Sequence, residues 1–313
     1  MKAFYLPACA LLLLGCNEPR EQDSNSATPT EDPSPAAEEQ DPNTISFTKV
    51  KRAPGDVRHD TERMAMNMKF TVVVGENPPQ EMEMRQTENE SSELTVLETT
   101  SGSISKVQLK VIEKESTQKI EQVGSKAPAQ EKTSPLTGKT LLLSRQGEEI
   151  IVTDEAGNPV DEVTRKAALE ETDNTFNKED SDKFHKLIPD RPVKLGETFT
   201  LEGQEAFDIF GDQDDITEAA LSLTLKERVL VEGREYAKFD TTMLMKVEPQ
   251  GGMLMDFTLK GSLLLDTATS WPSQMKLNGP FTLEGSQESP QGAVVSEGTG
   301  TMTMDMEATY SKK

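Results

Sequence analysis

The chain has 313 residues, a formal net charge of −22, two cysteines and two histidines. A surface that binds nucleic acid needs clustered lysine and arginine, so this acidic balance excludes nucleic acid as a partner. The charge favours solubility and is compatible with cationic partners.

Residues 1–15 have the layout of a secretory signal peptide. Lys2 supplies the positive charge of the N-terminal region, and an apolar run from Ala3 to Leu14 follows. The run is shorter than the roughly 20 residues that a membrane-spanning helix needs, which favours a cleaved signal.

The signal ends in Leu13-Leu14-Gly15-Cys16, which resembles the lipobox of bacterial lipoproteins. The resemblance implies cleavage between Gly15 and Cys16, diacylglycerol on the Cys16 thiol and an N-acyl chain, such as palmitate, on its amino group. The alternative is an ordinary cleaved signal with an incidental cysteine. Asn17 follows the lipidated cysteine, and by the enterobacterial sorting pattern this residue favours transport of the protein to the outer membrane. We therefore expect a protein anchored by lipid in the bacterial cell envelope and exported to the periplasm.

Cysteine usage limits the chemistry of the mature chain. Cys9 lies in the segment to be removed, so Cys16 is the one cysteine that remains. Because that thiol carries lipid, we expect no disulfide, no thiol nucleophile and no thiolate metal site. No cofactor besides the lipid is expected.

The linker that follows the lipidated cysteine, residues 16–43, is acidic. Residues 17–43 hold eight acidic residues, one arginine and no aliphatic side chain larger than alanine. Such a segment cannot bury enough apolar surface to offset its ordering entropy, so we expect it to be disordered. It would connect the membrane to a domain of residues 44–313.

That domain is dominated by apolar residues that alternate with polar ones, the pattern of half-buried strands. Turn signals separate them at 75–79, 157–159, 232–233 and 249–252. The pattern predicts a mainly β fold of long antiparallel meander strands that form curved sheets or a half-barrel. The alternating positions are Met64, Met66, Met68, Phe70, Val72 and Val74; Met82 and Met84; Val107, Leu109 and Val111; Leu221, Leu223 and Leu225; Phe239, Met243, Met245 and Val247; Met253, Met255, Phe257 and Leu259; Met275, Leu277, Phe281 and Leu283; and Met302, Met304 and Met306.

A short helical insert interrupts the strands. Asp161 is placed to cap a helix that runs to about Thr172, and Ser181 is placed to cap a shorter helix that ends at Leu187. The inward face of the first helix is expected at Val163, Ala167 and Leu169.

The segment Pro192-Val193-Lys194-Leu195-Gly196-Glu197-Thr198-Phe199 resembles a stretch of uncharacterised exported β-rich proteins, where Pro-Val-x-x-Gly-[Asp/Glu]-x-[Trp/Phe] leads into a second set of strands. It implies two β-rich halves, 44–155 and 190–313, joined by a helical segment at 156–189. Met-x-Met pairs occur in both halves, which makes an internal duplication plausible.

Catalysis has little support. His59 and His185 both lie among charged neighbours, so we expect both to be solvated, and the chain lacks a nucleophile elbow, a P-loop and a His-Glu-x-x-His motif. We expect a non-enzymatic protein without a metal site. An acidic cluster lacks the glycine of an EF-hand loop and is interpreted as a solvated loop, with weak calcium binding as the alternative. Its members are Asp212, Asp214, Asp215 and Glu218.

Methionine is the unusual feature, because side chains at i and i+2 of a strand share a face. We name the paired methionines the methionine face. Three interpretations stay open: filling of a packed core, a deformable apolar surface for a lipid or another apolar ligand, and a Cu(I) or Ag(I) site. The methionine face comprises Met64, Met66, Met68, Met82, Met84, Met243, Met245, Met253, Met255, Met302, Met304 and Met306.

Long antiparallel strands, an apolar inner face and a lipid anchor together resemble the LolA-like half-barrel carriers of bacterial envelopes. The resemblance concerns architecture, and fold does not fix function. The leading hypothesis is a structural or interaction lipoprotein with an envelope protein as its partner. The alternative is a module that binds a lipid or another apolar ligand.

The lipid anchor can be tested by a single substitution. We expect Cys16→Ser to move the protein from the membrane fraction to the soluble fraction, because stable anchoring needs the acyl chains that this residue carries. Fractionation followed by immunoblotting measures the change. Full retention of the variant in the membrane fraction would show that the lipobox interpretation is wrong.

Overall fold

The structure is a computed structural model, and it describes residues 43–125, 128–147, 149–176, 184–203, 205–206, 215–248, 252–289 and 292–312. The predicted signal peptide, Cys16 and almost all of the linker lie outside the described residues. So do Ser181, Asp212 and Asp214.

Most of the described chain is strand. None of the described helices is long and apolar enough to cross a membrane. The strands are β1 Thr44–Ile45, β2 Asp56–Val74, β3 Gln80–Thr100, β4 Ser103–Gln122, β5 Gln130–Thr133, β6 Thr140–Gln146, β7 Glu149–Asp154, β8 Val193–Lys194, β9 Thr198–Glu202, β10 Ile216–Val231, β11 Arg234–Val247, β12 Met253–Asp266, β13 Pro272–Ser289 and β14 Gly292–Lys312. The helices are α1 Glu162–Thr172, the 3-10 helix η1 Asp173–Phe176 and α2 Phe184–Leu187.

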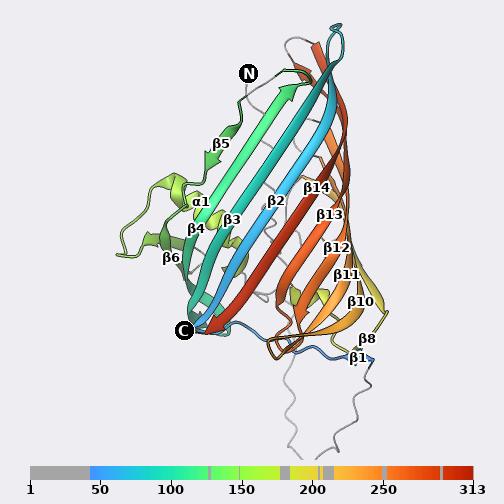
Figure 1. The fold of residues 1–313 in the computed structure, drawn as a ribbon. Helices are drawn as coiled ribbons and strands as arrows, with labels where there is room; N and C mark the ends of the chain where they lie inside the picture. Colours follow the sequence, from blue (N-terminus) through green and yellow to red (C-terminus); the bar gives the residue numbers. More distant parts are fainter. Residues whose placement is uncertain are drawn as a thin grey trace, which may run out of the picture.

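One 12-stranded antiparallel sheet holds all these strands except β1 and β8, which pair with each other. Its order is β7-β6-β4-β3-β2-β14-β13-β12-β11-β10-β9, and β5 pairs with β4 outside this path. Nearly every neighbour pair is consecutive along the chain, as in a meander. The main exception joins β2 to β14, so the last strand lies beside the first long one (Figure 1). The predicted mainly β fold of long antiparallel strands is confirmed.

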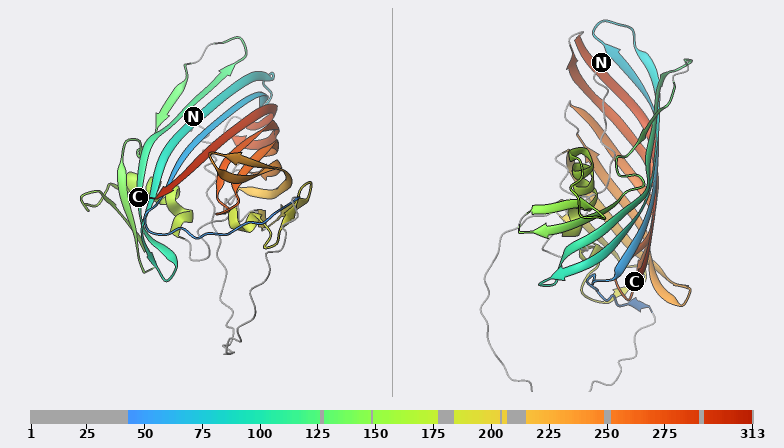
Figure 2. Two further views of the ribbon diagram at one scale, coloured as in Figure 1. Left: turned by 60° about the horizontal axis from the view of Figure 1, so that its bottom comes forward. Right: turned by 90° about the vertical axis from the view of Figure 1, so that its left-hand side faces the viewer.

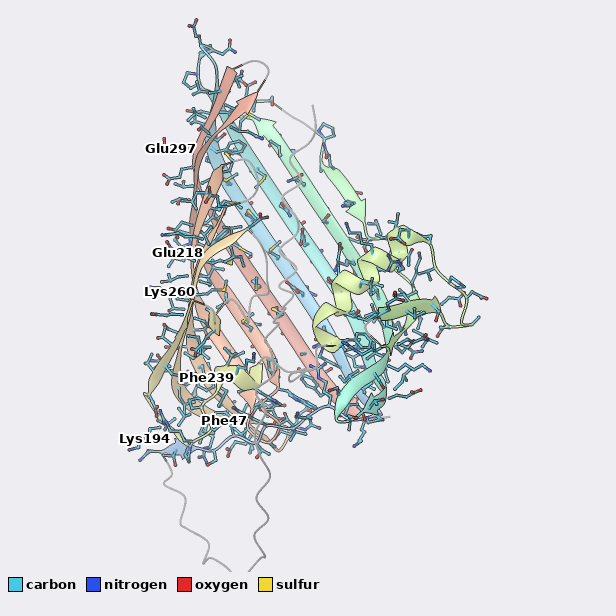
Figure 3. The ribbon with its side chains drawn as sticks, turned by 180° about the vertical axis from the view of Figure 1, so that it is seen from behind. Phe47, Lys194, Glu218, Phe239, Lys260 and Glu297 are labelled. Carbon is cyan, nitrogen blue, oxygen red and sulfur yellow. The ribbon has the colours of Figure 1, made fainter. Side chains whose placement is uncertain are left out.

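The sheet is open and strongly curled. Figure 2 shows that the strands from β9 to β13 curve around one side of the sheet, so that the sheet has a concave and a convex face. In Figure 3 the outward side chains Glu218, Lys260 and Glu297 lie along the convex face, whereas Phe239 and Phe47 lie toward the inside. The alternation of the sequence thus separates a wet convex face from a dry concave face.

Glycine permits the tightest part of the curl. A Cβ atom on Gly261 would lie 1.8 Å from the carbonyl oxygen of Lys276, and one on Gly279 would lie 2.0 Å from that of Thr258. Both contacts join β12 to β13 through backbone atoms, which cannot turn aside as a flexible side chain can. Residues at these positions must therefore lack a side chain.

The predicted N-terminus of the first helix is confirmed, but its predicted face is partly wrong. The backbone N–H of Thr164 donates to Oδ1 of Asp161 at 2.9 Å, which is an N-cap bond. Ala167 and Leu169 pack against the sheet as expected, whereas Val163 is 67% exposed. Smaller residues face the strands instead, and they let the helix approach the sheet closely. The buried face comprises Thr164, Ala168 and Thr172.

The close approach of β12 and β13 gives a stability prediction. We expect Gly279→Ala to lower the free energy of unfolding by about 2 kcal/mol or more, since the backbone must shift to admit the methyl group. Urea unfolding measures the loss. Thr301→Ala, on the exposed outer face of the neighbouring β14, is the control and should change stability by less than about 0.5 kcal/mol. Equal stability of the two variants would contradict the role assigned to Gly279.

Candidate functional site

The concave face carries the residues that the sequence singles out. Nine members of the methionine face are buried, and Met82, Met253 and Met306 are partly buried. Met275, which stands outside the paired groups, is partly buried against the same core. The buried members are Met64, Met66, Met68, Met84, Met243, Met245, Met255, Met302 and Met304.

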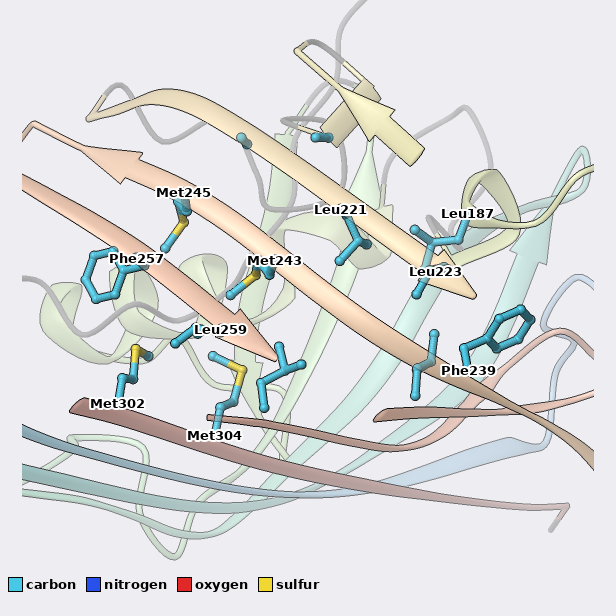
Figure 4. Packing of buried hydrophobic residues seen from close by; sticks show 14 of the residues in the cluster. Leu187, Leu221, Leu223, Phe239, Met243, Met245, Phe257, Leu259, Met302 and Met304 are labelled. Atoms are coloured by element: carbon cyan, nitrogen blue, oxygen red, sulfur yellow. The ribbon is translucent and has the colours of Figure 1, made fainter. Parts of the chain in front are cut away.

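The curl packs this face against itself. Figure 4 shows Met302 and Met304 of β14 pointing toward the side chains of β10, β11 and β12, among them Met243 and Met245. These side chains form one core with Phe257 and its neighbours. The ring of Phe257 stacks on that of Phe281, with 5.1 Å between the ring centroids. In the described residues, the methionine face is therefore largely the inside of a packed core.

The paired methionines of the two halves differ in register. In the β2–β3 hairpin, Met68 lies directly opposite Met84. In the β11–β12 hairpin, Met245 lies opposite Phe257, and Met255 lies opposite Val247. One pair of thioethers therefore faces across the first hairpin, whereas those of the second hairpin face other apolar side chains.

A second core lies at the other wing of the sheet. It includes Val107 and Leu109 of β4, Leu143 of β6 and Ala168 of α1. Figure 3 shows α1 lying across the concave side of this wing. The helix thus covers the part of the sheet that lies away from the curled strands.

Between the two cores, the concave face of β2, β3 and β4 is polar. Glu62 precedes the inward Met64 by two residues, and the register places it opposite Glu90, which in turn lies opposite Lys114. Glu171 reaches the same place from α1. We name this group the acidic band; it comprises Asp60, Glu62, Gln86, Glu88, Glu90, Lys114 and Glu171.

Lys114 is the centre of the acidic band. Its Nζ lies 2.7 Å from Oε2 of Glu90, and it also donates to Glu171. Burial alone would lower the pKa of Lys114, but Glu171 and Glu90 beside it raise that pKa above its ordinary value, so the lysine stays charged. This ion cluster ties α1 to the sheet.

Glu90 and Glu171 share a proton. Burial, the hydrogen bond to Glu171 and its charge raise the pKa of Glu90 to about 8, against the effect of Lys114. Burial also acts to raise the pKa of Glu171, but hydrogen bonds from Glu90 and Lys114 bring it below its ordinary value. At neutral pH Glu90 is therefore protonated and donates a hydrogen bond to the Glu171 carboxylate.

Glu62 is the least compensated carboxyl group of the acidic band. Burial raises its pKa to about 7; Lys114 lowers it, and the nearby carboxylates of Glu171, Glu88 and Asp60 raise it further. Lys114 acts on it through its charge alone, since none of the hydrogen bonds or ion pairs among the described residues involves Glu62. Its ionisation at neutral pH is therefore unfavourable.

The acidic band was not predicted from the sequence. Charged residues at inward positions interrupt the apolar alternation, so the pattern of hydrophobic residues that marks a strand is lost there. The strand period still holds the signal: Glu62 has the parity of Met64, and Glu88 and Glu90 have the parity of Met84.

The two histidines and the acidic residue Glu218 lie in different surroundings. The expectation that His185 is solvated is wrong: it is 4% exposed, and its Nε2 lies 3.1 Å from the carbonyl oxygen of Thr269. The reason is that α2 packs against the main core. His59 is on the convex face, with Nδ1 3.5 Å from Glu93. Glu218 pairs with Lys246 at 2.7 Å.

Metal ligands are not gathered in the described part of the chain. No group of three or more histidine, cysteine, aspartate and glutamate side chains there has a geometry that could hold a metal ion. In the acidic band, the ammonium group of Lys114 lies between Glu90 and Glu171.

Three hollows of the described surface lie away from the acidic band. Two shallow ones, of about 430 and 500 Å³, are lined mainly by outward residues of β2, β3, β13 and β14. A third, of about 710 Å³, lies between β7 and α1.

No protein-family model matches the chain, and none of the curated proteins matches it. Among solved structures, a lipovitellin described by its lipid–protein interactions is 9% identical with a TM-score of 0.38; the match covers 83% of this chain and 26% of that one. An outer membrane channel from Pseudomonas putida F1 is 8% identical with a TM-score of 0.22, covering 82% and 97%. A LolA superfamily protein from Nitrosomonas europaea is 7% identical with a TM-score of 0.14, covering 84% and 89%.

This chain spans about a quarter of the lipovitellin chain that it matches. All three TM-scores lie below 0.5, so these likenesses carry no argument about function.

The acidic band predicts a pH dependence of stability. Between about pH 4.5 and 7, folded Glu62 holds a proton that the unfolded chain releases, so the free energy of unfolding falls as the pH rises through this range. The free energy of unfolding of the wild type should fall by on the order of 2 kcal/mol between pH 5 and pH 8 because of Glu62. We expect Glu62→Gln to lack this decrease. Urea unfolding at the two pH values measures it.

The Glu90–Glu171 pair is present in both the variant and the wild type, so the difference between their pH dependences reports mainly on Glu62. Glu81→Gln, on the exposed convex face of β3, is the matched control and should keep the wild-type pH dependence. If Glu62→Gln and the wild type lose the same stability between pH 5 and pH 8, the burial assigned to this carboxyl group is wrong.

Proposed function

We propose that this chain is a lipid-anchored, non-enzymatic protein of the bacterial cell envelope, displayed from the outer membrane, whose curled sheet serves as a structural or interaction scaffold. The burial of the methionine face is the observation that favours this role. A ligand cavity lined by these thioethers would leave them open, whereas most of them are buried in one cluster with side chains of β10, β11 and β14.

The anchor and the location rest on the sequence. The lipobox and the acidic linker precede Asn43, where the described part of the chain begins. A long acidic linker would separate the scaffold from the anionic membrane surface and leave its convex face open to an envelope protein. That face is highly charged: Lys226–Asp240, Lys238–Glu227 and other ion pairs cross between neighbouring strands.

The non-enzymatic role rests on how the two histidines are used. His185 is buried at the end of the main core with its ring bonded to a backbone carbonyl, and His59 lies on the convex face beside Glu93. Both make structural contacts, and they lie on different faces of the molecule.

A second candidate function is the binding of an apolar ligand beside the core. The concave face continues beyond the buried methionines as Phe70, Met82 and Ile120, on β2, β3 and β4. Phe70 lies opposite Met82, and Ile120, which is 41% exposed, lies opposite Met84. We name Phe70, Met82 and Ile120 the apolar strip. Phe70 and Met82 are partly buried, so the strip is a partly exposed apolar surface, a feature that a binding site can use.

A double substitution tests whether the methionine face is a packed core or the wall of a ligand-binding cavity. We expect Met253→Gln with Met255→Gln to lower the melting temperature by on the order of 10 °C, because buried amides without partners add to the lost packing. Circular dichroism follows melting, and a fluorescent fatty acid is titrated in parallel. The matched control is Leu244→Gln with Val295→Gln, two exposed apolar residues, and should melt close to the wild type.

An unchanged melting temperature together with lost fatty-acid binding would contradict the scaffold role. Apolar-ligand binding by the methionine face would then become the leading function.

A further inference from the structure

The described chain begins at one end of the curled sheet. The carbonyl oxygen of Asn43 accepts a hydrogen bond from the backbone N–H of Leu195, and β1 then pairs with β8. From there residues 43–55 cross below the strand ends, where the backbone N–H of Thr48 donates to the carbonyl oxygen of Thr267, in the turn between β12 and β13. Figure 2 shows this segment in blue, beneath the lower ends of the strands.

The hairpin of β10 and β11 ends beside this segment. Nη2 of Arg228 donates to the carbonyl oxygen of Thr44 at 2.6 Å, which holds the tip of the hairpin, residues 228–235, next to the start of the described chain. Nζ of Lys49 lies 2.5 Å from Oδ1 of Asp190, so the chain around β8 is joined to the same place. We name this end of the molecule the basal end; it comprises residues 43–55, 190–197, 228–235 and 266–271.

The basal end is the basic part of an acidic protein. It has seven lysine and arginine residues and five aspartate and glutamate residues, whereas the whole chain has 33 and 55. Residues 43–55 alone contribute three cations and no carboxyl group. Lys194 and Arg234 are exposed at its surface. A net positive end on a protein of net charge −22 complements an anionic surface.

Exposed aliphatic side chains lie among these cations. Leu230 is 74% exposed, more than any other large apolar side chain of the described residues, and Val231 and Leu195 are 43% and 39% exposed. Glu232 and Gly233, with positive φ angles of 50° and 81°, form the turn that follows. The hairpin ends at this tight turn, so Leu230 and Val231 lie at a tip rather than over the core. Exposed aliphatic groups bordered by cations are typical of surfaces that enter the interfacial region of a bilayer.

The predicted anchor approaches the domain from the basal end. Cys16 precedes Asn43, where the described chain begins, so the linker joins the domain here. β2 runs from the basal end over 19 residues, which places the opposite end of the sheet about 60 Å farther along. With Cys16 in the membrane, the basal end is therefore the part of the domain nearest to the lipid, and the tether gives it a high effective concentration there.

The acidic linker is the other partner that the charge of the basal end would attract. Residues 17–43 contain no aliphatic side chain larger than alanine, so they complement the cations but would leave Leu230, Val231 and Leu195 in water. An anionic bilayer complements both features, because its headgroups pair with cations and its interfacial region accepts aliphatic groups. The observations therefore favour lipid over the linker.

We propose that the basal end docks on the surface of an anionic phospholipid bilayer. Leu230, Val231 and Leu195 enter the interfacial region, and Lys194 and Arg234 contact lipid phosphates. The inference rests on the proposed lipid anchor and adds a second contact with the same membrane. Docking at this end directs the strands away from the bilayer and leaves the convex face accessible to an envelope protein.

The test replaces the natural anchor by a chemical one. The chain from Cys16 to Lys313 has a single thiol, which is coupled to a maleimide lipid in vesicles of phosphatidylethanolamine and phosphatidylglycerol. Leu230→Trp is compared with Val295→Trp, a matched control that is 47% exposed at the opposite end of the sheet. Trp271 is common to both chains. We expect brominated acyl chains to quench the fluorescence of Leu230→Trp about threefold more strongly, because bromine quenches an indole that it contacts and the basal end meets the lipid.

A pair of charge substitutions tests the contact with the headgroups. In the Leu230→Trp chain, Lys194→Gln with Arg234→Gln should lower the quenching about twofold, since two cations that hold the tip on the phosphates are lost. The control is Lys69→Gln with Lys260→Gln, two exposed lysines of the convex face, and it should leave the quenching unchanged.

Equal quenching of Leu230→Trp and Val295→Trp overturns the inference, and it is also the result expected if the linker occupies the basal end. Undiminished quenching of the charge variant contradicts the contact with lipid phosphates and overturns the inference as well. Because coupling at Cys16 does not require lipidation in the cell, these outcomes are independent of the proposed anchor, whose failure is seen in the fractionation of Cys16→Ser. If circular dichroism shows that Leu230→Trp does not fold, Val231→Trp takes its place.

Discussion

A single sheet that has one apolar face must bury that face without a second sheet to pack against, and most features of this molecule follow from that constraint. The main sheet solves it by curling until β10 and β11 face β14. Opposing side chains on a curled sheet meet at distances that vary along each strand. An unbranched, flexible thioether adapts to such irregular gaps better than a branched side chain does, which explains why methionine recurs at the inward positions.

Curling cannot bury the whole width of twelve strands, so the wing formed by β3, β4, β6 and β7 is covered by α1 instead. Ala168, between Thr164 and Thr172, lets the helix lie close to the strands. Its last turn brings Glu171 to Lys114, where burial costs are offset by shared charges and a shared proton. The acidic band therefore lies where two different ways of covering the sheet meet, and neither of them removes all the carboxylates from water.

The strands, their antiparallel order and the helix cap at Asp161 could be predicted, because each is encoded in a local pattern: alternation, turn residues and a capping side chain. The pairing of β2 with β14 could not, since no local signal says which distant strands are neighbours. Val163 has the polarity of a core residue but lies on the wrong side of the helix, whose orientation depends on tertiary contacts. His185 is buried through the packing of α2, and the acidic band depends on which polar side chains the two cores enclose. These features depend on long-range contacts, which no local sequence pattern encodes.

The pairing of β2 with β14 also determines when the molecule can fold. The chain leaves the ribosome, or a translocation pore, with its N-terminus first, so β2 emerges early, and one of its edges has no neighbour until the final strand follows. Pairings between distant segments form slowly, and an uncovered strand edge is a template for aggregation. Until synthesis and export are complete, β2 to β4 form a hairpin series with an open edge and an uncovered apolar face. Such a chain depends on rapid release or on a chaperone that shields it, and a truncation that removes β14 would leave this open edge permanently uncovered.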